Sequence, residues 1–291
     1  VSAQYLKAGL TSDGNVNAWL HRTAYPSITS TFMPGVVHGA GFEFQQGMTN
    51  LPYEIENQRF ENGEAPAHVR IGWLRSVYNI IHGFSVNVFV DELAVEAGLD
   101  PFEFRMKLLG SDRVYPSDND YKLDTAKMKN VLSRVAKNSS WGAVLPDGHG
   151  RGLAIHYSFY SYVASVVEVS VLKGKLRVHK IFTVADCGTV VNHNTVRAQL
   201  EGAAVFGLSL AFYGNITAKE GKVVQGNYHD YEMLRIHQTP EIQIEVVQSE
   251  DLPTGIGEPG VPVVAPALIN AIFDATGKRF RSLPLKTHGL V

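Results

Sequence analysis

The chain has 291 residues, 45% of them apolar, and a formal net charge of -2. It is long enough to bury a large core in one large or two medium domains, and it lacks the positive charge that attracts nucleic acid or anionic membrane surfaces. No apolar run reaches the roughly 20 residues that a membrane helix needs. The single cysteine, Cys187, excludes a disulfide framework, a cysteine zinc site and an iron–sulfur cluster held by this chain alone.

Strand-forming runs dominate the first 75 residues. Alternating or β-rich runs, separated by prolines, glycines and an Asn-Gly turn signal, predict strands over residues 17–23, 36–44 and 58–61. A helix-and-loop section follows. Its apolar positions recur at helical spacing over residues 86–98, which predicts a helix that a glycine ends.

Two further helices carry their own start signals. Asp100 is followed by Pro101 and Glu103, which predicts a capped helix over the segment PFEFRMKLL. Asp124 likewise precedes an amphipathic helix that runs to about Ala136.

The second half of the chain begins near Gly150 and predicts a sheet with helices. Residues 156–171 combine aromatic and small residues in the alternation typical of strands. The remaining predicted elements, in chain order, are a hairpin at Lys173-Gly174, a strand over 176–185, a helix over 195–212, a hairpin at Glu220-Gly221 and a strand over 241–248.

This order of elements predicts an α+β fold in which two-layer mixed sheets carry packed helices. We expect two α+β subdomains, residues 1–149 and residues 150–291, the second of which carries the loop described next. The sequence shows no internal repeat and no low-complexity segment.

A stiff loop near the C-terminus holds the strongest candidate for chemistry. Glu258 stands between Gly257 and Pro259, and further glycines and prolines follow within a few residues. Apolar positions at helical spacing from Val264, with Gly277 as the C-terminal cap, predict a helix behind the loop. A carboxylate near the positive end of a helix macrodipole suits a general base or an anionic ligand. The alternative is a tight surface turn.

Other familiar catalytic patterns are missing from the sequence. The 11 histidines lack the i, i+4 pairing of a zinc-binding helix. Phosphate loops of the Walker or dinucleotide-binding type and a GxSxG nucleophile elbow are also missing. Cys187 has no recognisable partner arrangement, so we expect it to be a small buried hydrophobe. The sequence therefore does not support ordinary hydrolase chemistry.

Four separated stretches together resemble the molybdenum hydroxylases, the molybdopterin-binding large subunits of the xanthine dehydrogenase and aldehyde oxidoreductase group. The likeness is strongest to the β subunits of isoquinoline 1-oxidoreductases, and it covers almost the whole chain in order. The four stretches are GWLRSV from Gly72 with the helix that follows it, QLEGA from Gln199, NYHDYEMLRI from Asn227, and GIGEPGVPVVAPALINAIFDATGKRFRSLPL near the C-terminus.

The resemblance implies roles for individual residues. Glu258, with Gly257 beside it, matches the glutamate that acts as the active-site base in this family. Gln199 matches a glutamine that contacts the molybdenum–pterin cofactor, and Gly202 belongs to the same element. Arg75 lies on a loop that passes the cofactor. A helix-terminus amide for Gln199 and a surface ion pair for Arg75 are the alternatives.

The resemblance also implies a fold of the molybdenum-cofactor-binding type and a molybdenum–molybdopterin cofactor in its cytosine dinucleotide form. The protein itself would supply no direct metal ligand. Since this chain has one cysteine, the 2Fe-2S clusters would lie on a small iron–sulfur partner subunit. The implied reaction is oxidation of an N-heterocyclic, isoquinoline-like aromatic with water as the oxygen source, in the cytoplasm or periplasm of a bacterium. The alternatives are an aldehyde oxidoreductase of the same family and a non-catalytic scaffold.

Two departures from the family pattern bear on these expectations. The family's glycine-rich GGxFG and GQG elements are missing here, and we expect them in the remaining N-terminal part of the same large subunit, because the sequence opens at Val1 without an initiator Met. The more distant xanthine dehydrogenases have Arg-Gly-Phe-Gly where this chain has Arg75-Ser76-Val77-Tyr78.

Overall fold

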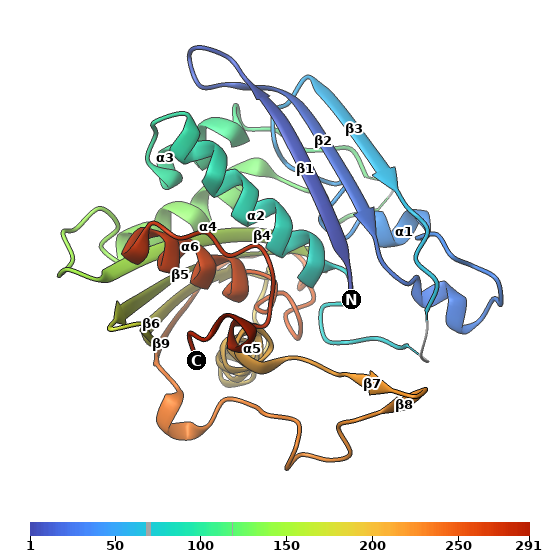
Figure 1. Cartoon of the computed structure of the whole chain (residues 1–291). Helices are drawn as coiled ribbons and strands as arrows, with labels where there is room; N and C mark the ends of the chain where they lie inside the picture. Colours follow the sequence, from blue (N-terminus) through green and yellow to red (C-terminus); the bar gives the residue numbers. More distant parts are fainter. Residues whose placement is uncertain (68–70, 118) are drawn as a thin grey trace. The chain divides into compact units, whose positions relative to one another are not determined.

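A computed structural model describes residues 1–67, 71–117 and 119–291 (Figure 1). The chain forms two compact units, Val1–Lys129 and Asn130–Val291, which divide within helix α4 (Thr125–Asn138). The subdomain boundary expected between residues 149 and 150 remains a prediction. Mixed sheets and packed helices confirm the expected α+β class.

The first unit contains a three-stranded mixed sheet in the order β1-β2-β3 (Figure 1). Strand β1 (Ala3–Leu10) pairs antiparallel with β2 (Val16–Ala24), and β3 (Asn57–Asn62) pairs parallel with β2. A parallel pair needs a long crossover connection. Here that connection contains the short helices η1 (Ile28–Thr31) and α1 (Gly41–Phe44).

The prediction of a strand over residues 36–44 is therefore wrong, since α1 occupies the end of this segment. The reason is Glu43, whose buried carboxylate accepts hydrogen bonds from the Ser27 hydroxyl at 2.9 Å, from the Ile28 amide at 3.1 Å and from the Ala40 amide at 2.8 Å. These bonds hold the backbone in a turn that cannot join a strand ladder. They also satisfy a carboxylate that would be costly to bury alone.

Helices α2 (Asn79–Glu96) and α3 (Pro101–Leu109) complete the first unit, together with part of α4. Helix α2 begins seven residues before the predicted start at Val86, since its first two turns are anchored by buried polar side chains that interrupt the apolar stripe. The predicted cap of α3 is confirmed, because the Asp100 carboxylate accepts from the amides of Phe102 at 2.8 Å and Glu103 at 3.1 Å.

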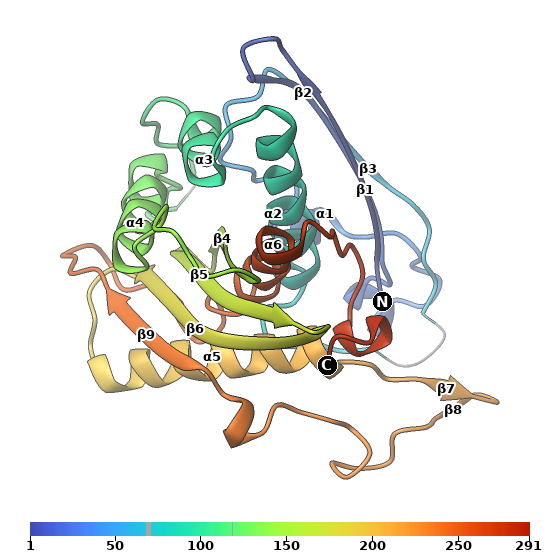
Figure 2. The same ribbon diagram turned by 60° about the vertical axis from the view of Figure 1, so that its left-hand side comes forward.

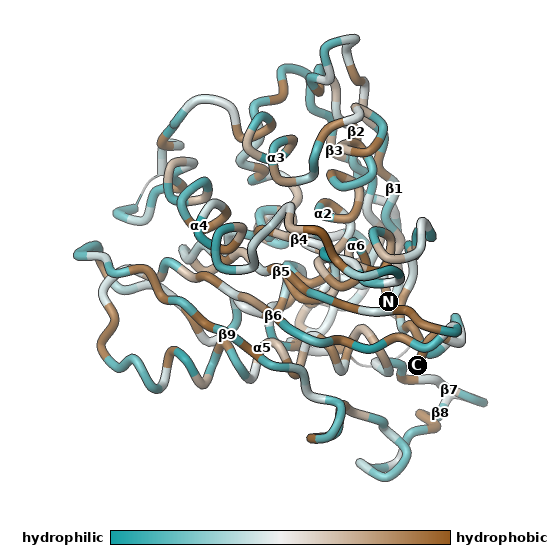
Figure 3. Tube along the Cα trace, turned by 90° about the vertical axis from the view of Figure 1, so that its left-hand side faces the viewer, coloured by the Kyte–Doolittle hydropathy of each residue, from teal (hydrophilic) through white to brown (hydrophobic). Residues whose placement is uncertain are grey.

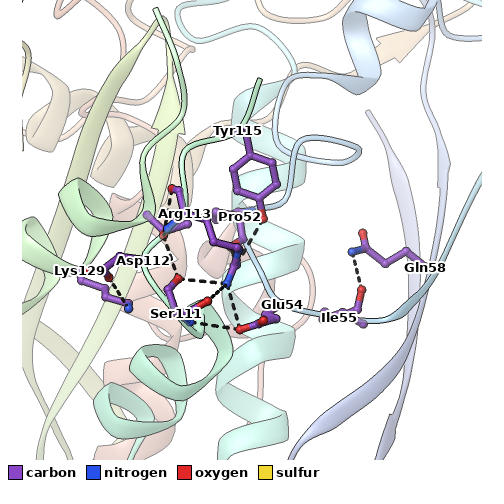
Figure 4. Close-up of polar contacts among 10 residues, drawn as sticks. Pro52, Glu54, Ile55, Gln58, Ser111, Asp112, Arg113, Tyr115 and Lys129 are labelled. Carbon is purple, nitrogen blue, oxygen red and sulfur yellow. Dashed lines mark hydrogen bonds and ion pairs between the residues drawn. The ribbon is translucent and has the colours of Figure 1, made fainter. Parts of the chain in front are cut away.

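A polar cluster fastens the segment after α3 to the segment before β3 (Figure 4). The Arg113 guanidinium donates to Glu54 Oε2 at 3.0 Å, to the Ser111 carbonyl at 3.1 Å and to the Pro52 carbonyl at 3.1 Å. The planar fork of arginine permits this multiple bonding, which a lysine ammonium could not reproduce in the same geometry.

The second unit is built on a four-stranded sheet in the order β4-β5-β6-β9 (Figure 2). The strands are β4 (His149–Ser158), β5 (Ser161–Leu172), β6 (Lys175–Asp186) and β9 (Glu241–Val246). Neighbours are antiparallel except β6 and β9, which are parallel. Most residues of β5 are buried, and Figure 3 shows apolar stretches around β5 and β6, so both faces of the sheet are covered.

Helices α5 (His193–Tyr213) and α6 (Val264–Thr276) pack against each other beside this sheet. Helix α6 approaches β4 so closely that a Cβ at Gly152 would lie 2.1 Å from the Ala271 nitrogen. Helix α5 meets α6 where a Cβ at Gly207 would lie 2.7 Å from the Val264 Cβ. The glycines that the sequence places inside α5 are thus partly explained by close helix packing.

The opposite face of the sheet carries α4. Gly152, Val167, Ile181 and Ile242 lie opposite one another on successive strands, so they are on the same face of the sheet. This is the face that α6 covers, because Gly152 lies against the helix. Glu245 of β9 points to the other face because side chains alternate along a strand. Two residues of α4 bond to it, Arg134 at 2.6 Å and Asn138 at 2.5 Å.

The segment between α5 and β9 is mostly exposed and irregular. It contains the hairpin predicted at Glu220-Gly221, formed by β7 (Ala218–Lys219) and β8 (Lys222–Val223), and the short helix η2 (Ile236–Gln238). A last short helix, η3 (Leu285–His288), follows α6. Across the part of the chain that the structure describes, no helix is both long and apolar enough to cross a membrane.

Candidate functional site

Glu258 lies half-buried in the loop that connects β9 to α6. Its carbonyl accepts a hydrogen bond from the Val261 amide at 3.0 Å, and the Val261 carbonyl accepts from the Val264 amide at 3.2 Å. Two successive turns therefore lead from Glu258 into α6. The helix runs from Val264 to Thr276 and is followed by Gly277, whose φ of 69° makes it the left-handed cap that the sequence predicts.

The loop is fixed on its C-terminal side by direct packing on α5. A Cβ at Gly260 would lie 2.7 Å from the Ala203 Cβ and 3.2 Å from Leu200 Cδ2. A side chain at this position would push the loop away from the helix. Gly260 is thus required because the loop and α5, which are distant in sequence, approach each other closely here.

The same stretch of α5 carries two of the predicted site residues. Leu200 and Ala203 are buried under the loop, whereas Gln199 and Gly202 lie on the exposed side of the same turn. The structure therefore places Gln199 and Gly202 on the part of α5 that the Glu258 loop contacts. Gly257 is exposed, and a Cβ at this position would meet no atom of the described residues within 4 Å.

The N-terminal side of the loop is fixed by hydrogen bonds. The Thr254 amide donates to the Cys187 carbonyl at 2.9 Å, and the Gly255 amide donates to the Phe159 carbonyl at 3.0 Å. The buried Ser161 hydroxyl lies 2.6 Å from Thr254 Oγ1 and donates to the Gly255 carbonyl at 2.7 Å. These bonds join the loop to the β4–β5 turn and to the end of β6.

That β4–β5 turn consists of two aromatic residues in left-handed backbone conformations. Ser158 pairs with Ser161, and between them Phe159 has a φ of 50° and Tyr160 a φ of 65°. Turns of this kind usually contain Asn-Gly or Asp-Gly. The sequence pattern missed the turn because neither residue is a turn former. Phe159 is 39% exposed and Tyr160 43% exposed, and Phe159 lies beside Gly255.

Burial sets the protonation of two nearby groups. Burial, assisted by the charge of Asp186, raises the pKa of Cys187 to about 11, so the thiol stays protonated at neutral pH. The burial of Cys187 confirms the prediction that it is a small buried side chain. Burial also raises the pKa of Tyr157 to about 12, with a smaller contribution from Tyr160.

Arg75 belongs to the first unit. It is half-buried in a turn before α2, and the next two residues, Ser76 and Val77, have φ values of 76° and 51°. The positive φ at Ser76 is the conformation that glycine adopts most easily, and glycine occupies that place in the Arg-Gly-Phe-Gly element of the more distant xanthine dehydrogenases. Ser76 therefore holds a conformation that a glycine would adopt with less strain.

Residues 100–240 match the family model described as a molybdopterin cofactor-binding domain. The chain is 36% identical over 233 residues to a membrane-bound aldehyde dehydrogenase (pyrroloquinoline-quinone) of Gluconacetobacter polyoxogenes, covering 77% of this chain and 30% of that protein. It is 31% identical over 299 residues to a nicotinate dehydrogenase subunit of Pseudomonas putida, covering 96% of this chain and 25% of that protein. It is 29% identical over 241 residues to the β subunit of the isoquinoline 1-oxidoreductase of Brevundimonas diminuta, covering 81% and 29%.

The fold also matches a solved structure. The aldehyde oxidoreductase of Desulfovibrio gigas superposes with a TM-score of 0.71 at 14% identity, over 97% of this chain and 48% of that one. At this identity the likeness concerns the fold alone. The chain spans less than a third of the length of the three curated relatives.

Proposed function

Because this chain belongs to the molybdenum hydroxylase family, as part of its molybdopterin-binding subunit, we propose that the Glu258 loop forms part of the active site of an oxidoreductase. The substrate would be an N-heterocyclic aromatic compound or an aldehyde. The observation that carries the proposal is a half-buried carboxylate on a loop that is fixed on both sides, by hydrogen bonds and by packing on α5.

The residues present fit a large, hydrogen-bonding cofactor. Gln199 and Gly202 are exposed on α5, and Gly257 is exposed on the loop that packs against this helix. Within residues 1–67, 71–117 and 119–291, no group of three or more His, Cys, Asp or Glu side chains could hold a metal ion. In our proposal the molybdenum is held through its pterin, in the cytosine dinucleotide form, and not by protein ligands. When bound, this cofactor would supply the two-electron oxidant.

The chain's own residues would bind and move protons around that cofactor. Glu258 would act as the general base, accepting the proton from the oxygen that enters the substrate. Gln199 would hydrogen-bond the cofactor through its amide. Arg75 carries a permanent charge and a planar fork of donors, which suits an anionic pterin or phosphate oxygen.

Water as the oxygen source and 2Fe-2S clusters on a small partner subunit complete the proposal. Two of the curated relatives are named as subunits, which supports an assembly of several chains. Turnover in ¹⁸O-labelled water tests the first point, because the label would then enter the product. Unlabelled product would contradict it.

The aromatic turn favours a planar aromatic substrate over an aldehyde. Phe159 and Tyr160 present partly exposed rings next to the segment that leads to Glu258, and aromatic rings stack favourably on one another. The names of the relatives include both nicotinate and isoquinoline enzymes and an aldehyde dehydrogenase, so aldehyde oxidation is the second candidate. Values of kcat/KM for isoquinoline-like compounds and for aldehydes separate the two.

Replacing the proposed base tests the function directly. In the native enzyme, Glu258→Gln keeps the size of the side chain and removes its basicity, so we expect kcat to fall by about 10²- to 10⁴-fold. Molybdenum and pterin content should stay near the wild-type level. Glu250→Gln, an exposed carboxylate between β9 and the same loop, is the matched control and should not change kcat. Unchanged turnover in Glu258→Gln would leave the non-catalytic scaffold as the better explanation.

A further inference from the structure

We propose that Ser161 is a positioning residue for Glu258. Its hydroxyl holds Thr254 and Gly255 against the β4–β5 turn and so fixes the loop that carries Glu258. This inference rests on the proposed role of Glu258. The hydrogen bonds of the Ser161 hydroxyl go to Thr254 and Gly255, four and three residues before Glu258. Ser161 lies at the start of β5, is fully buried, and reaches across 93 residues of sequence to Thr254.

The direction of the hydrogen bonds follows from the chemistry of a hydroxyl. Ser161 has one proton, and the Gly255 carbonyl at 2.7 Å can only accept it. The Thr254 hydroxyl at 2.6 Å must then be the donor of the other bond, with Ser161 Oγ as the acceptor. The serine thus joins a side chain and the backbone of two adjacent residues.

The loop needs such an anchor because of its composition. Gly255 and Gly257 both precede Glu258, and glycine has more backbone freedom than any other residue. The two hydroxyl bonds act together with the backbone bonds of the Thr254 and Gly255 amides to fix one end of this glycine-rich stretch, while packing of Gly260 on α5 fixes the other. Without the first anchor, Glu258 would sample positions away from its productive one. Misplacement of a catalytic group by about 1 Å can cost about 100-fold in rate.

A second serine on the same strand provides a matched control. Ser165 is also fully buried, and its hydroxyl lies 2.8 Å from the Thr183 hydroxyl of β6. This pair has the same chemistry as the Ser161–Thr254 pair, but it joins two strands of the sheet and not the Glu258 loop. Both Ser161→Ala and Ser165→Ala therefore remove a buried serine–threonine hydroxyl bond, and Ser161→Ala removes the bond to the Gly255 carbonyl as well.

The experiment uses the native enzyme with its cofactor and any partner subunit. For Ser161→Ala and for the isosteric Thr254→Val we expect kcat to fall by about 10- to 100-fold, with KM and molybdenum content near wild type. Amide hydrogen exchange of residues 254–258 should become faster in both variants, and this readout does not depend on turnover. Thr254→Ser, which keeps the hydroxyl, should restore kcat and exchange to near wild-type values. Ser165→Ala should lower the unfolding temperature without changing kcat or the hydrogen exchange of residues 254–258.

Two results would overturn the inference. One is Ser161→Ala with unchanged kcat and unchanged exchange of residues 254–258. The other is Ser165→Ala lowering kcat as much as Ser161→Ala does, since the effect would then reflect general stability. If instead Glu258→Gln keeps its turnover, the proposed function fails. The exchange data still show whether Ser161 holds the loop.

Discussion

Phe159 and Tyr160 occupy a backbone conformation that aromatic residues rarely adopt. Two consecutive left-handed residues of this size cost about 1–3 kcal/mol each in backbone strain. Asn-Gly would form the same turn with less strain. Such strain often occurs at functional sites, and here the strained turn lies against the segment that leads to Glu258.

We expect the double variant Phe159→Asn/Tyr160→Gly to gain stability and lose activity. Relief of the strained turn should raise the free energy of unfolding by about 1–2 kcal/mol, measured by urea denaturation. If the rings contact an aromatic substrate, KM for that substrate should rise by about 10-fold or more, since aromatic contacts contribute about 0.5–1.5 kcal/mol beyond burial. A variant that is less stable and keeps its KM would contradict both parts.

At the scale of elements, contact between α6 and β4 positions the whole loop. Gly150 and Gly152 let the helix backbone lie directly on the strand, because a Cβ at either position would come within 2.4 Å of α6 backbone atoms. This contact fixes how α6 lies on β4. It therefore also fixes the N-terminal end of α6, which follows Glu258 in the chain. Gly207 serves the same purpose between α5 and α6.

Gly152→Ala should therefore be strongly destabilising. The added methyl group would overlap the Ala271 nitrogen and the Ala267 carbonyl, and backbone atoms cannot rotate away as a flexible side chain can. Overpacking of this kind costs typically about 1–3 kcal/mol, and we expect a loss at the upper end of that range in thermal or urea unfolding. Gly226→Ala is the control, because its Cβ would have an ordinary 3.7 Å contact. Equal stability of the two variants would show that α6 can shift on the strand.

At the scale of the molecule, buried histidines should govern stability in mild acid. His21 and His82 lie fully buried in the first unit with ring centroids 5.8 Å apart. Burial and the neighbouring His82 lower the pKa of His21 to about 3. Burial lowers the pKa of His82 to about 4, although its bond to the Gln46 carbonyl acts in the opposite direction. Both rings are therefore neutral in the folded protein at neutral pH.

The sign of the pH dependence follows from these values. The unfolded chain takes up protons at both histidines near pH 6.5, whereas the folded protein does so only near pH 4 and pH 3. The free energy of unfolding should be greatest above pH 6.5 and fall as the pH decreases towards 4, by up to about 1.4 kcal/mol per pH unit for each group. Urea unfolding at pH 7 and pH 5 measures the loss. His21→Gln should reduce it, while removal of the exposed His38 should not. Equal stability at the two pH values would contradict the prediction.

The sequence by itself determined the features that depend on a few neighbouring residues. Asp100 caps α3 because its own side chain reaches the next two amides along the helix, and Gly277 ends α6 because glycine adopts a positive φ. The α+β class followed from the order of such local signals. Glu258 could be selected because its glycine and proline frame is visible in the sequence, and the resemblance of four stretches gave it a chemical role.

Only the tertiary structure decided which distant residues meet. The strand predicted over residues 36–44 is replaced by a turn because Glu43 bonds to Ser27 and Ile28, which belong to a different segment. The contact of Gly260 with α5 and the bond of Ser161 to Thr254 join residues that are separated by dozens of positions. Local propensity and periodicity contain no information on such pairs, because the pairs form only when the sheet and its helices pack. The position of Glu258 is therefore a property of the fold, although its identity as the candidate base is written in the sequence.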